Sequence, residues 1–136
     1  MNFSGKILLV DDEAHIRKFV GLILKGLGSP TIFEASDGLI ALALYAQEKP
    51  DLILLDVNMP NLDGLQTLER LRQIAPEANV VMLTSLANRQ TVEECARLGA
   101  LDYIRKDMPK EEISAKLRDV IADCFGPESP TPTVPS

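Results

Sequence analysis

Short, mostly apolar runs alternate along this chain with longer segments whose apolar residues recur at every third or fourth position. The runs cover residues 6–10, 31–35, 51–55, 79–83 and 102–105. Brief apolar runs of this kind are typical of strands that are covered on both faces of a sheet. Five strand–helix repeats therefore predict an α/β protein in which helices pack on both faces of a parallel sheet.

The segments between the runs carry helix signals at their ends. Asp37 is placed to cap the second helix, which Pro50 prevents from continuing, and Gly28 and Gly99 end the first and fourth helices. The last helix has the clearest apolar stripe, made of Ile113, Leu117, Val120, Ile121 and Cys124.

The chain has 136 residues, of which 46% are hydrophobic and 25% charged, and this size and balance fit one domain. We assign that domain to residues 1–125. Residues 126–136 are rich in proline and are expected to form a disordered tail or the start of a linker. Aromatic residues make up only 4%, so the core must be built from aliphatic side chains.

Charge and signal content exclude several classes of protein. Twenty acidic residues against fourteen basic ones give a net charge of −6, which argues against binding to nucleic acid through phosphate contacts. No apolar run is long enough for a signal peptide or a membrane span, so a cytoplasmic location is expected. Cys95 and Cys124 lack metal-site spacing and are expected to be reduced, mostly buried thiols, and His15 is expected on a helix surface.

Polar side chains follow four of the five predicted strands. Asp11 and Asp12 follow the first strand, Asp56 the third, Thr84 the fourth and Lys106 the fifth. Because ligands bind beyond the carboxyl ends of parallel strands, these side chains are expected to converge on one edge of the sheet. Three carboxylates gathered there repel one another unless a cation neutralises them, and a set of oxygen ligands favours Mg²⁺.

This combination suits the transfer of a phosphoryl group to an aspartate. A carboxylate oxygen of Asp56 would attack phosphorus, while Mg²⁺ and Lys106 neutralise the phosphoryl oxygens and the Thr84 hydroxyl donates a hydrogen bond to one of them. The set is more informative than its members, since Asp11 or Asp12 alone could simply cap the following helix.

A known family carries a similar pattern: the receiver domain of two-component response regulators, in particular of the chemotaxis type. The resemblance rests on the stretch DVNMPNLDG at residues 56–64 and on five strand-end residues, Asp11, Asp12, Asp56, Thr84 and Lys106. It covers roughly residues 5–125. It implies a flavodoxin-like, doubly wound (βα)5 fold with five parallel strands in the order 2-1-3-4-5. It also implies a signalling domain that catalyses its own phosphorylation and turns over no external substrate.

Under this resemblance, Asp56 accepts a phosphoryl group from a histidine of a sensor kinase or from a phosphotransfer protein. Mg²⁺ is held by Asp12, Asp56 and the backbone carbonyl of Asn58. Asp11 assists through a water molecule, and Lys106 binds the phosphoryl group.

The resemblance also implies a switch and a binding face. Thr84 moves toward the phosphoryl group while the ring of Tyr103 turns inward, and the fourth helix, fifth strand and fifth helix then present a changed face to a downstream protein. Arg89, Glu93 and Tyr103 are candidate contacts on that face, which can also mediate a homodimer.

Two features bear on how this receiver would work. The family usually has a proline directly after the lysine, often with a cis bond, but here Asp107 follows Lys106 and Pro109 comes two residues later. The geometry of the lysine and the rate of phosphorylation therefore depend on this loop. Leu86 cannot orient an attacking water, and we expect Leu86 and Asn58 together to set the lifetime of the phosphoryl group.

Three other functions fit parts of the pattern. A degenerate receiver that docks without phosphorylation would explain the missing proline but not the complete acidic set. A phosphatase with an aspartate nucleophile would need a second acid where Asn58 stands. A flavodoxin-like cofactor binder would need a loop able to cradle phosphate, where the acids at residues 11–13 would repel an anion.

Overall fold

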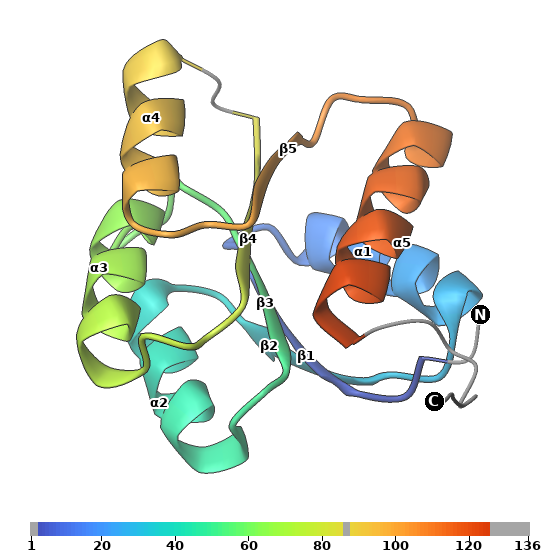
Figure 1. Cartoon of the computed structure of the whole chain (residues 1–136), viewed down its shortest axis with the longest axis horizontal. Helices are drawn as coiled ribbons and strands as arrows, with labels where there is room; N and C mark the ends of the chain where they lie inside the picture. Colours follow the sequence, from blue (N-terminus) through green and yellow to red (C-terminus); the bar gives the residue numbers. More distant parts are fainter. Residues whose placement is uncertain (1–2, 86–87, 126–136) are drawn as a thin grey trace, which may run out of the picture.

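Five parallel strands form the central layer of the molecule (Figure 1). The structure, a computed structural model, describes residues 3–85 and 88–125. The strands are β1 (Lys6–Val10), β2 (Thr31–Ala35), β3 (Leu52–Leu55), β4 (Val80–Thr84) and β5 (Asp102–Arg105). They lie in the order β2-β1-β3-β4-β5, which confirms the predicted fold class and strand order.

Helices cover both faces of the sheet, as the alternating pattern predicts. One face carries α1 (Ala14–Leu27) and α5 (Lys110–Phe125) (Figure 1). The other face carries α2 (Gly38–Glu48), α3 (Gly64–Ile74) and α4 (Arg89–Arg97). The direction in which the strands are added reverses at β1, which pairs with both β2 and β3, and the carboxyl ends of β1 and β3 therefore flank the place where such sheets bind ligands.

A separate apolar cluster lies on each face of the sheet, and the central strands contribute to both. Leu9 and Leu54 pack on the side of α1 and α5, whereas Leu8 and Ile53 pack on the side of α2 and α3. None of these four side chains is more than 3% exposed. Because both faces of β1 and β3 are buried, their sequences read as unbroken apolar runs.

The predicted ends of the second helix are confirmed. The Asp37 side chain accepts the N–H of Ile40 at 2.9 Å, and α2 ends at Glu48, followed by the capping residue Lys49, whose φ of 50° leaves the helical region just before Pro50. A further cap went unnoticed in the sequence. Asp63 and Gln66 form a reciprocal capping box at the start of α3, and their spacing is the signal that identifies it.

Three boundaries, in two of the strands, differ from the prediction by one residue. β3 and β4 begin after Asp51 and Asn79, and β4 includes Thr84, which was expected to follow it. The Asp51 side chain accepts the backbone N–H of Lys6 at 2.8 Å, and the Asn79 side-chain amide donates to the Asp51 carbonyl at 3.2 Å. These two polar side chains thus form hydrogen bonds with backbone groups at the starts of β1 and β3, although Asp51 and Asn79 themselves lie just before their own strands.

The start of α3 approaches the end of β3 so closely that only glycine fits there. A Cβ atom on Gly64 would lie 2.0 Å from the carbonyl oxygen of Asp56 and 2.7 Å from the Cα of Val57. The Gly64 N–H donates to the Val57 carbonyl at 2.8 Å. The backbone that carries Asp56 is therefore held between its strand and the next helix.

Residues 126–136 lie outside the described part of the chain, so the predicted division into a domain at 1–125 and a tail stays a prediction. Within the described ranges, no helix is long and apolar enough to cross a membrane.

Gly64→Ala is expected to lower the free energy of unfolding by about 1–3 kcal/mol, because the new methyl group forces the Asp56 backbone to move. Gly26→Ala is the matched control, since no atom lies within 4 Å of its added Cβ and Gly26 is inside α1. That control should raise stability by up to about 1 kcal/mol. Urea denaturation measures both, and equal stability of the two variants would contradict the predicted contact.

Candidate functional site

Backbone pairing beyond the strand ends places two of the predicted acids. The N–H of Asp11 donates to the Ala35 carbonyl at 3.0 Å, and the N–H of Asp56 donates to the Val10 carbonyl at 2.9 Å. Each aspartate is therefore the first residue after a buried strand, and its backbone is still hydrogen-bonded to the neighbouring strand. Both side chains are buried, with exposed fractions of 5% for Asp11 and 4% for Asp56.

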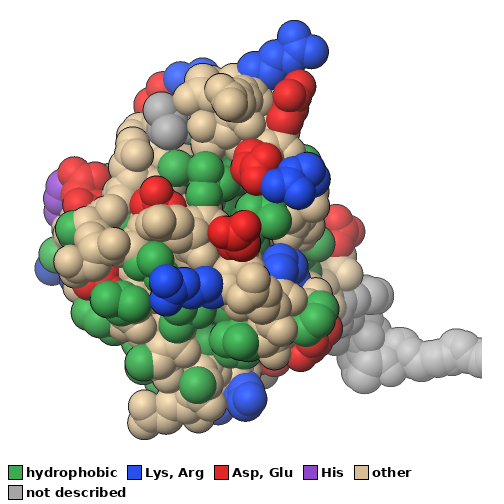
Figure 2. Space-filling view, turned by 90° about the vertical axis from the view of Figure 1, so that its left-hand side faces the viewer, with side chains coloured by type: hydrophobic (Ala, Val, Ile, Leu, Met, Phe, Trp, Pro, Cys, Tyr) green, Lys and Arg blue, Asp and Glu red, His purple; other side chains and the backbone are tan. Residues whose placement is uncertain are grey.

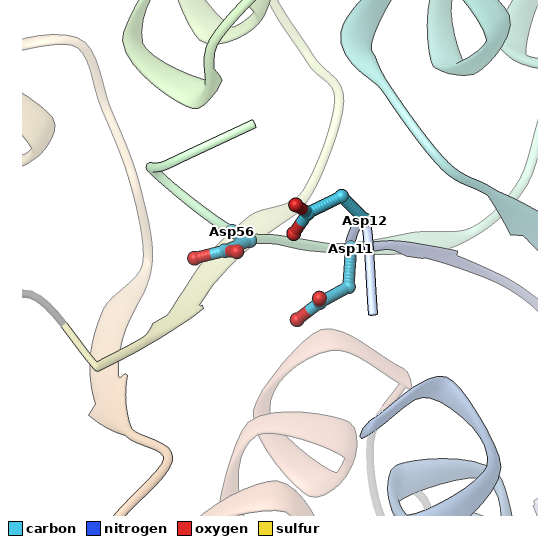
Figure 3. Close-up of side chains that lie close together, drawn as sticks. All are labelled: Asp11, Asp12 and Asp56. Atoms are coloured by element: carbon cyan, nitrogen blue, oxygen red, sulfur yellow. The ribbon is translucent and has the colours of Figure 1, made fainter. Parts of the chain in front are cut away.

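The carboxylates of Asp11, Asp12 and Asp56 converge beyond the ends of β1 and β3 (Figure 3). One oxygen from each lies within 4.8 Å of the others, and Asp12 is the exposed member. Neither Asp11 nor Asp12 occupies the N-cap position of α1, which belongs to Glu13. The three oxygens form a donor set suited to a hard divalent cation such as Mg²⁺.

Lys106 reaches this acidic pocket from the turn after β5. Its ammonium forms ion pairs with Asp11 and with Asp56, the latter at 3.1 Å, and lies 3.7 Å from a carboxylate oxygen of Glu13. The side chain of Lys106 is only 10% exposed. A buried ammonium thus contacts two buried carboxylates, and the charges compensate one another only in part.

Burial and charge shift two pKa values in this pocket. Burial raises the pKa of Asp11, the nearby Asp56 charge adds to the effect, and hydrogen bonds from Lys106 and from the Glu13 N–H oppose it without cancelling it. For Lys106, burial works to lower the pKa, but its contacts with Asp11 and Asp56 prevail and raise it. The ammonium is therefore charged at neutral pH, while the ionised form of Asp11 is disfavoured by the fold.

Thr84 and Tyr103 lie on the adjacent strands β4 and β5. Thr84 is the last residue of β4 and is fully buried, and its carbonyl accepts the backbone N–H of Lys106 at 3.0 Å. Tyr103 is half-buried and packs against the cluster on the side of α3 and α4. This burial raises the pKa of Tyr103.

The remaining predicted positions are placed as follows. Asn58 is exposed, two residues beyond Asp56. The Lys106–Asp107 bond is trans, since the described residues contain no cis peptide bond. Leu86 lies outside the described residues. Cys95 is buried, Cys124 is half-buried and His15 is exposed, as expected.

Arg17, which the sequence analysis did not identify, contacts the backbone of the acidic pocket. Its guanidinium donates to the backbone carbonyl of Asp11 at 2.6 Å and to the Glu34 carboxylate at 2.7 Å. Helical spacing places Arg17 on α1, but no sequence pattern reveals that its side chain turns toward the acidic loop.

The predicted target face contains α4, β5 and α5. Arg89 and Glu93 form an exposed ion pair of 3.0 Å on α4. On the side of the molecule that carries α2, α3 and α4, acidic and basic side chains are interspersed among apolar ones (Figure 2).

Comparisons with known proteins agree with this geometry. The family model "Response regulator receiver domain" matches residues 7–118. Sporulation initiation phosphotransferase F of Bacillus subtilis is 36% identical over 110 residues, which span 81% of this chain and 88% of that protein. Chemotaxis protein CheY of the same organism is 32% identical over 110 residues, which span 81% of this chain and 92% of that protein.

A solved structure shows the same architecture. The response regulator domain of Thermotoga maritima CheB superposes with a TM-score of 0.81 at 28% identity, covering 93% of this chain and 99% of that domain. The sheet order, the three converging aspartates and the lysine after β5 thus occur within a sequence that the family model matches over most of its length. The chain belongs to the family of response regulator receiver domains, the signalling domains of two-component systems.

Proposed function

We propose that this receiver accepts a phosphoryl group on Asp56 from a histidine of a sensor kinase or of a phosphotransfer protein. The observation that carries the proposal is the contact of the buried Lys106 ammonium with both Asp56 and Asp11. An ammonium in that position can neutralise charge that develops on a phosphoryl group joined to Asp56. The names of two relatives, a sporulation phosphotransferase and a chemotaxis protein, support a role in relaying signals.

The transfer is a displacement at phosphorus. An oxygen of the Asp56 carboxylate forms the new P–O bond while the bond from phosphorus to the donor imidazole nitrogen breaks, and that nitrogen keeps the electron pair. The Lys106 ammonium neutralises the negative charge of the phosphoryl oxygens, and the Thr84 hydroxyl donates a hydrogen bond to one of them. Burial of Asp56 limits access of water to the reacting oxygen.

The pocket fits Mg²⁺, because three carboxylates supply oxygen ligands within 4.8 Å of one another. Asp12, Asp56 and the backbone carbonyl of Asn58 would hold the ion, and Asp11 would assist through a water molecule. When bound, Mg²⁺ supplies positive charge that draws a phosphoryl group toward Asp56.

Phosphorylation would be read out through Thr84 and Tyr103, with the ring of Tyr103 turning further inward as Thr84 moves. The face of α4, β5 and α5, with Arg89 and Glu93, would then bind a downstream protein or a second copy of the domain. The half-buried state of Tyr103 supports this switch, since part of the residue's surface is still exposed and could become buried. A cytoplasmic location belongs to the same proposal.

Asp56→Asn is expected to abolish phosphorylation, because the amide is a poor nucleophile. The measurement is intact mass after incubation with acetyl phosphate and Mg²⁺. The unsubstituted chain should gain the mass of one phosphoryl group, and it should show no gain when Mg²⁺ is chelated beforehand. Asp51→Asn, the same change at the other end of β3, is the matched control and should be phosphorylated normally.

No gain of mass by the folded, unsubstituted chain would contradict the proposal and favour a receiver that docks without phosphorylation. Steady hydrolysis of a small phosphoester would favour the phosphatase instead. A phosphoryl group that remains on the Asp56→Asn variant would place the acceptor elsewhere.

Asp11→Asn is expected to stabilise the metal-free protein and to weaken Mg²⁺ binding. The raised pKa of Asp11 means that the folded protein binds a proton at this carboxylate more tightly than the unfolded chain does. The free energy of unfolding of the parent protein therefore increases as pH falls through that pKa. The variant lacks this dependence. Its advantage in urea denaturation with a chelator should therefore be larger at about pH 8 than at about pH 5. A variant less stable than the parent at the higher pH would contradict the charge analysis.

A further inference from the structure

The residue after the lysine takes part in an unusual contact. Residues Arg105 to Met108 form a turn, closed by a hydrogen bond of 3.3 Å from the Met108 N–H to the Arg105 carbonyl. Across this turn, the Arg105 guanidinium holds the Asp107 carboxylate with two bonds, Nε to Oδ1 at 3.0 Å and Nη2 to Oδ2 at 2.6 Å. The planar fork fixes both position and orientation, which a single point charge does not.

The fork and the lysine lie on opposite sides of the turn. Lys106 points inward, where its ammonium contacts Asp11 and Asp56, and it lines a small cavity together with Ile16, Val20 and Ile113. Arg105 and Asp107 point outward, with side chains 52% and 57% exposed. The residue that enters the acidic pocket is therefore flanked by two residues that are tied to each other on the outside.

We propose that the Arg105–Asp107 pair is a positioning clamp that holds the Lys106 ammonium over Asp11 and Asp56. The inference rests on the proposed phosphorylation of Asp56 and adds two residues that act through Lys106. A proline after the lysine would fix φ of the turn through its ring, whereas Asp107 leaves that angle free. The Lys106 N–H is bonded to the Thr84 carbonyl at 3.0 Å, but the hydrogen bond that closes the turn is longer, at 3.3 Å, so the fork adds a restraint on the turn beyond Lys106.

The Arg105–Asp107 contact also neutralises the negative charge of Asp107. An isolated Asp107 carboxylate beside the pocket would repel a phosphoryl group, but the guanidinium of Arg105 neutralises it at 2.6 Å. A clamp and a simple field effect make opposite predictions for removal of the acid. If only the field mattered, removing the acid would speed phosphorylation and removing the base would slow it. If the clamp matters, removing either partner slows it.

The test compares the full chain with Asp107→Ala, Arg105→Gln and the double variant, each treated with acetyl phosphate and Mg²⁺. In this reaction the Asp56 oxygen forms a bond to phosphorus and acetate leaves with the electron pair of the broken P–O bond. Initial rates are measured over a range of donor concentration. Each single variant should lower the maximal rate about two- to five-fold, which is what one exposed ion pair can supply.

The half-saturating donor concentration should change less than the maximal rate, because the clamp orients Lys106 for the reaction and does not recruit the donor. The double variant should be no slower than the slower single variant, since one contact is lost in all three. Arg97→Gln is the matched control. It breaks a similar two-bonded, exposed pair with Glu94 on α4, with the same change of charge, and should leave the rate unchanged.

Opposite effects of the two single variants, or additive losses in the double variant, would overturn the clamp while phosphorylation of Asp56 stands. An unsubstituted chain that is not phosphorylated would overturn both proposals together. Thermal unfolding of each variant checks that it is folded, and because both partners are exposed, the midpoints should stay close to that of the parent.

Discussion

The concentration of negative charge at the carboxyl ends of β1 and β3 is the constraint around which this molecule is arranged. The carboxylates of two buried aspartates and one exposed aspartate lie close enough together to bind the same cation. In the described part of the chain, Lys106 supplies the one ammonium that contacts this group. The surrounding apolar layers keep water away and so strengthen both attraction and repulsion. The repulsion among these carboxylates therefore opposes folding and favours the binding of a cation.

The sequence predicts most of the fold because the local signals agree with one another. Apolar runs mark the strands, caps such as Asp37 mark helix ends, and the doubly buried centre of the sheet leaves no ambiguity about β1 and β3. The site was predictable for the same reason. Polar residues directly after buried strands can only meet at one edge of a parallel sheet, so Asp11, Asp56 and Lys106 come together whatever the details of the loops.

Contacts made by long, flexible side chains could not be predicted in this way. Arg17 and Arg105 each choose their partners through several rotatable bonds, and their sequence positions indicate only a helix and a strand end. Side-chain contacts of a similar kind lie at the shifted starts of β3 and β4, where Asp51 and Asn79 bond to the backbone of Lys6 and Asp51. The capping box of Asp63 and Gln66 is different, because the spacing of these two residues in the sequence is enough to predict it.

The guanidinium of Arg17 links Glu34, on the edge strand β2, to the backbone carbonyl of Asp11. Glu34 is exposed, and exposure alone would class it among positions that accept almost any residue. A change there releases one end of the guanidinium that braces the acidic loop. Mutational tolerance along β2 should therefore follow connection to the pocket and not solvent exposure, even at a surface position far from Asp56 in sequence.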